Sequence, residues 1–380
     1  MGSAIDAVQA MTAREDLRIG LVLGSSTGGM GRHVLSLVRG LSQDGVAVTV
    51  FCPATTEAQF RYAAAGASVI PLEIPARPGG RDLGAVGDLR RALRADPMAV
   101  LHAHGLRAGL VAALARPSAT PLVVTWHNPV LGDGVRARAL RVAERVVARS
   151  ADVTLGASED LVARAAALGA RDARLGPVAA PALSVAPGGP ELVRAELEAV
   201  GRPLIVSVGR LHPQKGYHNL VAAAARWRRL DPRPVVVIAG TGPAYRQLAA
   251  QILSARAPVT LLGHRDDVGD LLAAADVAVV SSVWEARQLF AQEALRAGTP
   301  LVATSVGGLP DLVGDAAWLI PPDDVDALDA AVRTLLDDDR LRTRYAAAGV
   351  ARAATWPTEA ETVELVRSVY AELVSSIVRP

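Results

Sequence analysis

Two cationic side chains stand five residues apart where an apolar run of the second half of the chain ends. Arg210 and Lys215 follow Gly209 in the segment 206–217. A guanidinium offers a planar fork of donors and an ammonium a compact charge, so the two can converge on a diphosphate. Lys215 is the single lysine among 40 basic residues. That exception favours a diphosphate contact over the alternative, two solvated surface charges.

A glycine-rich turn follows the first apolar run of the chain. Residues 24–31 read Gly-Ser-Ser-Thr-Gly-Gly-Met-Gly and lead into a helical pattern. Glycines let backbone approach a ligand closely, and a helix N-terminus offers unpaired N–H groups, so Gly28 and Gly29 predict an anion site. The turn fits neither the dinucleotide fingerprint G-x-G-x-x-G nor a P-loop. The alternative is a tight turn that serves packing.

Two carboxylates lie eight residues apart after another apolar run. Glu285 falls in a predicted strand-to-helix loop and Glu293 about two turns later in the helix. Carboxylate oxygens accept hydrogen bonds from paired sugar hydroxyls, so the two could hold a ribose and a hexose. Taken alone, this spacing also fits ordinary helix-surface charge.

Short apolar runs alternate with amphipathic segments and predict buried parallel strands joined by helices. This alternation of strands and helices predicts an α/β fold with two doubly wound parallel sheets. A Pro/Gly-rich stretch at 176–190 predicts a linker. We expect an N-terminal domain over 1–185, with 360–380 packing back on it, and a C-terminal domain over 186–359. The runs occupy residues 18–24, 46–51, 99–102, 121–126 and 152–155 in the first half, and 204–208, 234–239, 259–262, 277–281, 301–304 and 317–320 in the second.

Composition excludes several classes of protein. Net charge is +2 and only 3% of residues are aromatic, which disfavours a nucleic-acid binder. The lone Cys52 excludes an internal disulfide and a cysteine-rich metal site. The first residues carry Asp6, Glu15 and Asp16 without a basic n-region, and no apolar stretch reaches the length of a membrane span. We therefore expect a cytoplasmic protein.

As a set, these motifs resemble glycosyltransferase family 4, the retaining nucleotide-sugar-dependent enzymes of the GT-B fold. The resemblance covers about residue 18 to the C-terminus and implies two Rossmann-like domains facing a central cleft. It implies transfer of a hexose from a UDP- or GDP-linked sugar to a glycan, lipid or small-metabolite acceptor, without a cofactor or bound metal. The matching segments are Gly28-Gly29, Thr125-Trp126-His127, Gly209-Arg210 with Lys215, residues 239–243, Glu285 with Glu293, and residues 298–310.

The family implies roles for individual residues. Gly28 and Gly29 would face the donor phosphates, and Arg210 and Lys215 would neutralise the diphosphate as the leaving group departs. Glu293 would accept the ribose hydroxyls, Glu285 would orient the donor sugar and His127 would contact its hydroxyls. Further donor-binding residues would be Gly209, Leu289 and Arg265, the last in a loop near the base.

One segment departs from the family pattern. Members commonly follow the first glutamate with Gly-Phe-Gly or Gly-x-Pro, whereas this chain has Ala286-Arg287-Gln288. Backbone contacts to the sugar that glycine allows are thereby put in question. Arg287 has two open interpretations: contact with an anionic group on donor or acceptor, or an outward-pointing side chain.

Two smaller features have functional and ordinary interpretations. His102 and His104 alternate, so both point to one side of a strand, where cleft lining or core packing is favoured over metal binding because no third ligand has suitable spacing. Arg138, Arg141, Arg145 and Arg149 fall on one helical stripe. The stripe could contact the inner face of a membrane peripherally, or it could be a solvated face of an Arg-rich protein.

The resemblance therefore implies a retaining hexosyltransferase. The alternatives are a sugar-nucleotide epimerase or phosphorylase on the same fold, with Lys215 carrying pyridoxal phosphate in the latter case, or a catalytically degenerate sugar-nucleotide-binding protein.

Overall fold

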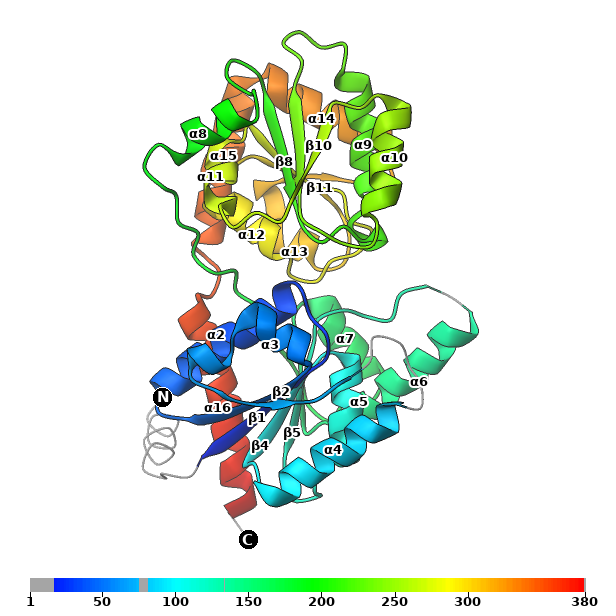
Figure 1. Ribbon diagram of the computed structural model, residues 1–380, viewed down its shortest axis with the longest axis vertical. Helices are drawn as coiled ribbons and strands as arrows, with labels where there is room; N and C mark the ends of the chain where they lie inside the picture. The colour runs from blue at the N-terminus through cyan, green and yellow to red at the C-terminus, as the bar shows by residue number, and fades with distance from the viewer. Residues whose placement is uncertain (1–16, 75–80, 133, 379–380) are drawn as a thin grey trace. The chain divides into compact units, whose positions relative to one another are not determined.

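The computed structural model describes residues 17–74, 81–132 and 134–378, and the chain divides into two compact units (Figure 1). The first unit extends to Val178 and resumes at Pro357, and the second is Ala179–Trp356. Asp6, Glu15 and Asp16, on which the expectation about a signal peptide depends, lie outside the described residues.

The first unit is built on a seven-stranded parallel sheet in the order β3-β2-β1-β4-β5-β6-β7. The order reverses between β1 and β4, because the chain first adds strands on one side of β1 and then returns to add the rest on the other. The strands are β1 (Arg18–Leu23), β2 (Ala47–Cys52), β3 (Ser68–Pro71), β4 (Val100–His104), β5 (Leu122–Trp126), β6 (Val153–Gly156) and β7 (Ala173–Leu175).

Helices cover both faces of this sheet. The C-terminal helix α16 packs against α2 and β4, and its Val363, Val366 and Tyr370 join one apolar core with Val34 and Leu37 of α2. Helix α16 therefore belongs to the first unit. The helices are α2 (Gly29–Gln43), α3 (Ala54–Phe60), α4 (Arg81–Ala95), α5 (Leu106–Ala115), α6 (Val135–Ser150), α7 (Glu159–Ala167) and α16 (Glu359–Val378).

The second unit repeats the architecture with six parallel strands in the order β10-β9-β8-β11-β12-β13. Here the order reverses between β8 and β11. The strands are β8 (Leu204–Val208), β9 (Val235–Ala239), β10 (Val259–Gly263), β11 (Val277–Val280), β12 (Leu301–Thr304) and β13 (Trp318–Ile320). The helices are α8 (Gly189–Glu196), α9 (Tyr217–Trp227), α10 (Tyr245–Ala255), α11 (Val268–Ala274), α12 (Leu289–Arg296), α13 (Leu309–Val313), α14 (Val325–Asp337) and α15 (Asp339–Ala353).

Neighbouring residues of the second sheet pack into opposite cores. Leu204 and Val206 face one apolar cluster, with α11, α12 and α15, whereas Ile205 faces the other, with α9 and α14. Because both faces are covered, nearly every position of such a strand is apolar, and β8 shows no polar alternation. Its one polar residue, Ser207, donates its hydroxyl to the Val279 carbonyl at 2.6 Å. The predicted α/β fold with two parallel-sheet, Rossmann-like domains is confirmed.

Two strands were not predicted, and both lie at the edges of the first sheet. β3 and β7 are only partly buried along their length. An edge strand needs fewer apolar residues because one of its sides lacks a neighbour. Neither segment therefore shows the apolar run that reveals the inner strands.

Candidate functional site

The cationic residues of the second unit lie on the loop that leaves β8. The loop contains Gly209 and Arg210, then a short 3-10 turn over Pro213–Lys215, and α9 begins at Tyr217. The His212 imidazole caps the turn by accepting a hydrogen bond from the Gln214 amide at 3.3 Å. Burial, and to a lesser extent the charges of Arg210 and Lys215, lower the pKa of His212.

Lys215 forms an ion pair with a residue seventy positions away. Its Nζ lies 2.6 Å from Oε1 of Glu285, which also accepts a hydrogen bond from the Ser282 hydroxyl at 2.7 Å. The side chains of Lys215 and Glu285 are 19% and 9% exposed. Two residues predicted separately as diphosphate and sugar contacts thus form one partly buried charge pair.

The order of the strands explains why Lys215 and Glu285 lie next to each other. β8 and β11 are neighbours at the point where the second sheet reverses direction, so the loops that leave their carboxyl ends lie together. In open α/β sheets this point is the usual ligand site. The two loops are joined further by hydrogen bonds from the Val283 amide to the Gln214 carbonyl and from the Ser281 hydroxyl to the Lys215 carbonyl.

Gly216 allows the loops to approach this closely. Its φ is +61°, in the left-handed region, and a Cβ there would lie 1.9 Å from the carbonyl oxygen of Ser281. Any side chain at this position would both strain the backbone and push the two loops apart. The placement of Lys215 against Glu285 depends on this glycine.

Helix α12 carries the second predicted carboxylate. Leu289 begins the helix and is partly buried, while Glu293 is buried within it. The same helix binds the first residues of the unit: the Gln292 side chain accepts a hydrogen bond from the Ala180 amide at 3.1 Å, and the Arg296 guanidinium donates to the Ala180 carbonyl. Glu293 therefore stands on a helix anchored at several points.

The other two predicted cations differ in their surroundings. Arg210 is exposed and has no hydrogen-bond or ion-pair partner among the described residues. Arg265 is fully engaged: its guanidinium pairs with Glu196 of α8 and with Asp267, with contacts from 2.6 to 3.0 Å. Those contacts hold the loop after β10 in place, and a direct contact of Arg265 with a donor base remains a prediction.

The segment that departs from the family pattern has its own geometry. The Arg287 guanidinium lies 5.5 Å from the centre of the Trp356 ring, and its Nε and Nη2 are buried without a hydrogen-bond partner among the described residues. Burial and the nearby Arg296 and Arg352 lower the pKa of Arg287 to about 10. The partly buried side chain therefore packs against Trp356 and meets no carboxylate among the described residues.

In the first unit, the glycine-rich turn leads into α2 as predicted. Gly28 is the N-cap of α2, and a Cβ built on it would have nothing within 4 Å. Gly28 is exposed and Gly29 partly exposed. A fifteen-residue helix thus begins at an open turn, where its first N–H groups can reach an anion.

Four histidines gather near the same end of the first sheet. His102 is a core residue, because its two ring nitrogens contact the Tyr370 hydroxyl at 2.6 Å and the Thr125 hydroxyl at 2.7 Å. His104 is buried beside it, and its Nδ1 lies 3.4 Å from Nε2 of His127, the residue that follows β5. His33, from α2, packs against the rings of both His104 and His127. Core packing is thus the correct interpretation of His102.

Within the described part of the chain, no group of three His, Cys, Asp or Glu side chains is placed to hold a metal ion. Two runs of aspartates, residues 266–267 and 337–339, contribute to helix starts. Asp338 caps α15 by accepting from the Leu341 amide, and Asp267 stands at the start of α11 beside Arg265.

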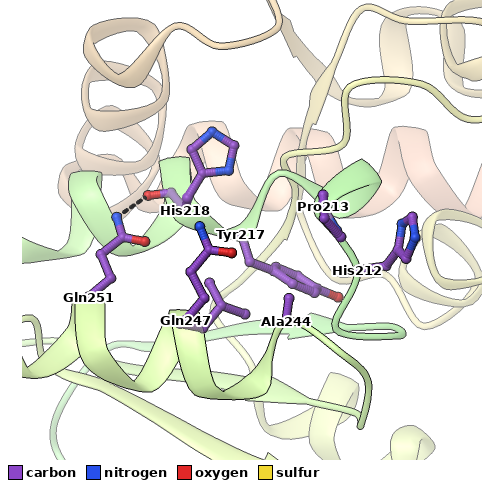
Figure 2. A pocket seen from close by; sticks show the side chains of 8 residues that line it. His212, Pro213, Tyr217, His218, Ala244, Gln247 and Gln251 are labelled. Carbon is purple, nitrogen blue, oxygen red and sulfur yellow. Dashed lines mark hydrogen bonds between the residues drawn. The ribbon is translucent and has the colours of Figure 1, made fainter. Parts of the chain in front are cut away.

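A small cavity lies between α9 and α10 (Figure 2). The Tyr217 ring lies between His212 and His218, and the Gln251 amide donates to the His218 carbonyl at 2.9 Å. The cavity has a volume of about 60 Å³, well below the roughly 300 Å³ at which ligand pockets begin. None of the predicted donor-binding residues lines it.

Comparison with known proteins assigns the family. Residues 190–352 match the family of glycosyl transferases group 1, and residues 28–181 match the glycosyl transferase 4-like domain. The glycogen synthase of Mycobacterium tuberculosis is 31% identical over 84% of this chain and 85% of its own length. The chain belongs to glycosyltransferase family 4.

Other relatives of this glycosyltransferase have different names. The D-inositol 3-phosphate glycosyltransferase of Corynebacterium aurimucosum is 29% identical, with 92% of each chain covered. Among solved structures, the HepE protein of Anabaena in complex with UDP-glucose superposes with a TM-score of 0.81 over 95% of this chain and 100% of that one, at 21% identity. The structural likeness confirms the predicted GT-B fold, and the named relatives favour a transferase over the epimerase and phosphorylase alternatives.

Sequence reasoning did not find every residue around these groups. It overlooked Ser282, Gln214 and His33. Ser282 could have been found because it follows a predicted strand directly, and His33 because it stands one helical turn after Gly29. Gln214, whose amide donates to the Trp284 carbonyl at 2.9 Å, gave no signal in the sequence.

Proposed function

We propose that this glycosyltransferase transfers a hexose, with retention of configuration, from a UDP- or GDP-linked sugar to an acceptor bound by the first unit. The observation that carries the proposal is the pairing of Lys215 with Glu285 at the switch point of the second sheet. A cation that neutralises a diphosphate and a carboxylate that accepts sugar hydroxyls are there held side by side.

The pair suggests how the donor enters. A diphosphate carries more charge than one carboxylate, so it takes over the ammonium of Lys215 and leaves Glu285 free to accept hydrogen bonds from the sugar. Arg210, which is exposed on the same loop as Lys215, supplies a second cation. Each charge-assisted contact contributes about 1.5–3 kcal/mol, and it gains in strength as negative charge develops on the leaving diphosphate.

Solved relatives support the donor class, and curated relatives leave the acceptor open. HepE is described in complexes with UDP and with UDP-glucose, which favours a uridine donor. The two curated relatives are named for a glycan product and for an inositol phosphate acceptor. These two names support a glycan or a small metabolite as acceptor, and a lipid is the third acceptor class that we propose.

A thermal-shift panel of UDP-, GDP- and ADP-sugars tests the donor. A ligand at a hundredfold excess over its dissociation constant stabilises the protein by about 2.7 kcal/mol, which is enough to rank the donors. Calorimetry of Lys215→Ala and Glu293→Ala should then show weaker binding of the best donor. Arg333→Ala, an exposed arginine of α14, is the control. Unchanged affinity in both site variants contradicts the proposal.

We further propose that transfer needs neither a metal nor a cofactor, because two side-chain cations already stand where charge must be neutralised. Transfer should therefore persist in excess chelator with the donor that the panel ranks first. Loss of transfer that Mg²⁺ or Mn²⁺ restores would contradict this part of the proposal.

Helix α6 supports a proposal of weak peripheral contact with anionic lipid. Arg138, Arg145 and Arg149 are exposed, and Val142 and Val146 between them are 62% and 39% exposed. Arg141 is less available for such a contact, because its guanidinium donates to the Gly132 carbonyl at 2.7 Å. The acidic residue of the helix, Glu144, is buried and paired with Arg164, so it does not offset the stripe. No described helix is long and apolar enough to cross a membrane.

Sedimentation with vesicles tests this contact. Binding should occur with anionic and not with neutral vesicles, and it should fall in the double variant Arg138→Glu with Arg145→Glu. Arg333→Glu is the matched control. Equal binding to both kinds of vesicle, or none, would leave the stripe as a solvated face.

A further inference from the structure

Three imidazoles converge near the carboxyl end of the first sheet. The ring centres of His33, His104 and His127 are 5.5, 5.6 and 5.7 Å apart in pairs, and His33 packs edge-on against the other two. Burial lowers the pKa of His33 to about 4 and that of His127 to about 3, and it holds the pKa of His104 well below its usual value. All three rings are therefore uncharged at neutral pH.

An uncharged imidazole has one N–H and one lone pair, so its chemistry depends on which nitrogen carries the proton. The contact that links the group is between Nδ1 of His104 and Nε2 of His127, at 3.4 Å. One of these two nitrogens must donate and the other accept. The choice decides what the remaining nitrogen of each ring can do.

Burial of the far nitrogen of His104 resolves the choice. Its Nε2 has no hydrogen-bond partner among the described residues and is shielded from solvent. If His127 donated, Nε2 of His104 would carry a buried N–H without an acceptor. If His104 donates, that nitrogen holds only an unused lone pair. A buried N–H without an acceptor is the rarer and costlier arrangement, so His104 is the donor.

We propose that His104 is a positioning residue that holds His127 in the tautomer with the proton on Nδ1, so that His127 offers an N–H donor to a hydroxyl oxygen of the sugar. The nature of the ligand rests on the function proposed above, whereas the tautomer does not. Nδ1 of His127 has no partner within the described part of the chain, and the residue is only partly buried. It is therefore available to a ligand.

The assignment also limits what His127 can do. Its lone pair, on Nε2, is directed to His104, so no basic nitrogen is left to take a proton from the acceptor hydroxyl. His127 then donates a hydrogen bond that orients the sugar hydroxyl, and it does not act as a general base.

Long-range ¹H–¹⁵N NMR of the full chain labelled with ¹⁵N-histidine tests the tautomer at pH 7. The expected result is a protonated Nδ1 and a bare Nε2 for both His104 and His127, with signals assigned from His104→Asn and His127→Asn. A protonated Nε2 on His127, or a mixture of tautomers, overturns the inference even if a nucleotide sugar binds.

Paired variants separate positioning from packing. His104→Asn keeps an amide N–H close to the place of Nδ1 and should preserve the His127 tautomer. His104→Leu removes the donor and should yield mixed tautomers. The leucine variant should also bind UDP-glucose, or the sugar nucleotide that the panel ranks first, between about twofold and tenfold more weakly, with the free diphosphate unaffected.

His218→Asn, an exposed histidine of the second unit, is the control and should change neither measurement. Equal losses for the sugar nucleotide and the free diphosphate in His104→Leu would indicate a general structural defect and contradict the positioning role. If the wild-type chain binds no nucleotide sugar at all, the proposed function fails, while the NMR result still decides the tautomer.

Discussion

The candidate residues of the second unit carry full charges, whereas the histidines near the corresponding end of the first unit are uncharged at neutral pH. In the second unit, Lys215 is neutralised by Glu285 across two loops. In the first, His33, His104 and His127 are kept neutral by burial. Both sites lie at the carboxyl ends of doubly wound sheets. The same architecture therefore supplies two kinds of chemistry, and the loop residues decide which.

The largest expected effect comes from breaking the charge pair. Lys215→Met should lower the free energy of unfolding of the second unit by about 2–4 kcal/mol, because a mostly buried carboxylate loses its cation. Chemical denaturation followed by tryptophan fluorescence measures this, since Trp126 is the one tryptophan of the first unit and Trp227, Trp284, Trp318 and Trp356 belong to the second.

The double variant Lys215→Met with Glu285→Gln is the matched control. It removes both charges and should recover more than half of the loss. If the single and double variants are equally destabilised, the pair does not act as a unit and the contrast between the two sites weakens.

The next largest effect is that acid should lower the free energy of unfolding of the first unit more than that of the second. A histidine whose pKa is lowered in the folded state binds a proton more readily when unfolded, so stability falls as pH drops below the unfolded pKa near 6.5. For His33, with a folded pKa of about 4, the loss between pH 6.5 and 5 is about 1.5 kcal/mol. His102, His104 and His127 shift in the same direction.

Calorimetric unfolding at pH 7 and at pH 5 measures this effect. The first unit should lose more stability than the second, where His212 is the histidine with a lowered pKa. Glu196 and Asp267 do not interfere, because a carboxyl with a lowered pKa destabilises only when pH falls below its own unfolded value near 4. His33→Gln should reduce the slope, and a greater loss in the second unit would contradict the prediction.

The smallest effect concerns Arg287, whose guanidinium is largely buried and has no carboxylate partner among the described residues. Arg287→Met should raise the free energy of unfolding by up to about 1 kcal/mol, since it replaces a largely buried charge with an apolar chain of similar length against Trp356. Thermal unfolding measures the gain. Arg352→Met is the contrast, because its guanidinium donates to the Asp311 and Leu312 carbonyls and its loss should destabilise.

A stable Arg287→Met variant with weaker donor binding would show that the arginine serves a ligand and not the fold. Unchanged donor binding would assign the departure from the family pattern to packing.

The inner strands could be predicted because a strand that is buried on both faces is a run of mostly apolar residues in the sequence. β8 and β12 have the predicted bounds, whereas β3 and β7 were missed because edge strands need little apolar surface. Burial is a local property of a segment and can therefore be recognised from that segment alone.

Contacts between distant residues could not be predicted in the same way. The rarity of lysine singled out Lys215, but its pairing with Glu285 depends on β8 and β11 being neighbours, which is a property of strand order. Likewise, the contact of His33 with His127 depends on where α2 lies relative to the end of β5, which the sequence of neither segment reveals. Arg287 was left with two interpretations because a charged residue gives no sequence signal of burial.

The return of the chain into the first unit has a consequence for synthesis on the ribosome. The second unit is contiguous and can fold as soon as Trp356 has emerged, whereas the first unit lacks α16 until the segment after Pro357 has been made. Until then, Val34 and Leu37 lack the side chains of α16 that cover them, and His102 lacks the Tyr370 hydroxyl. The first unit begins earlier along the chain, but its core is therefore completed after the second unit has been synthesised.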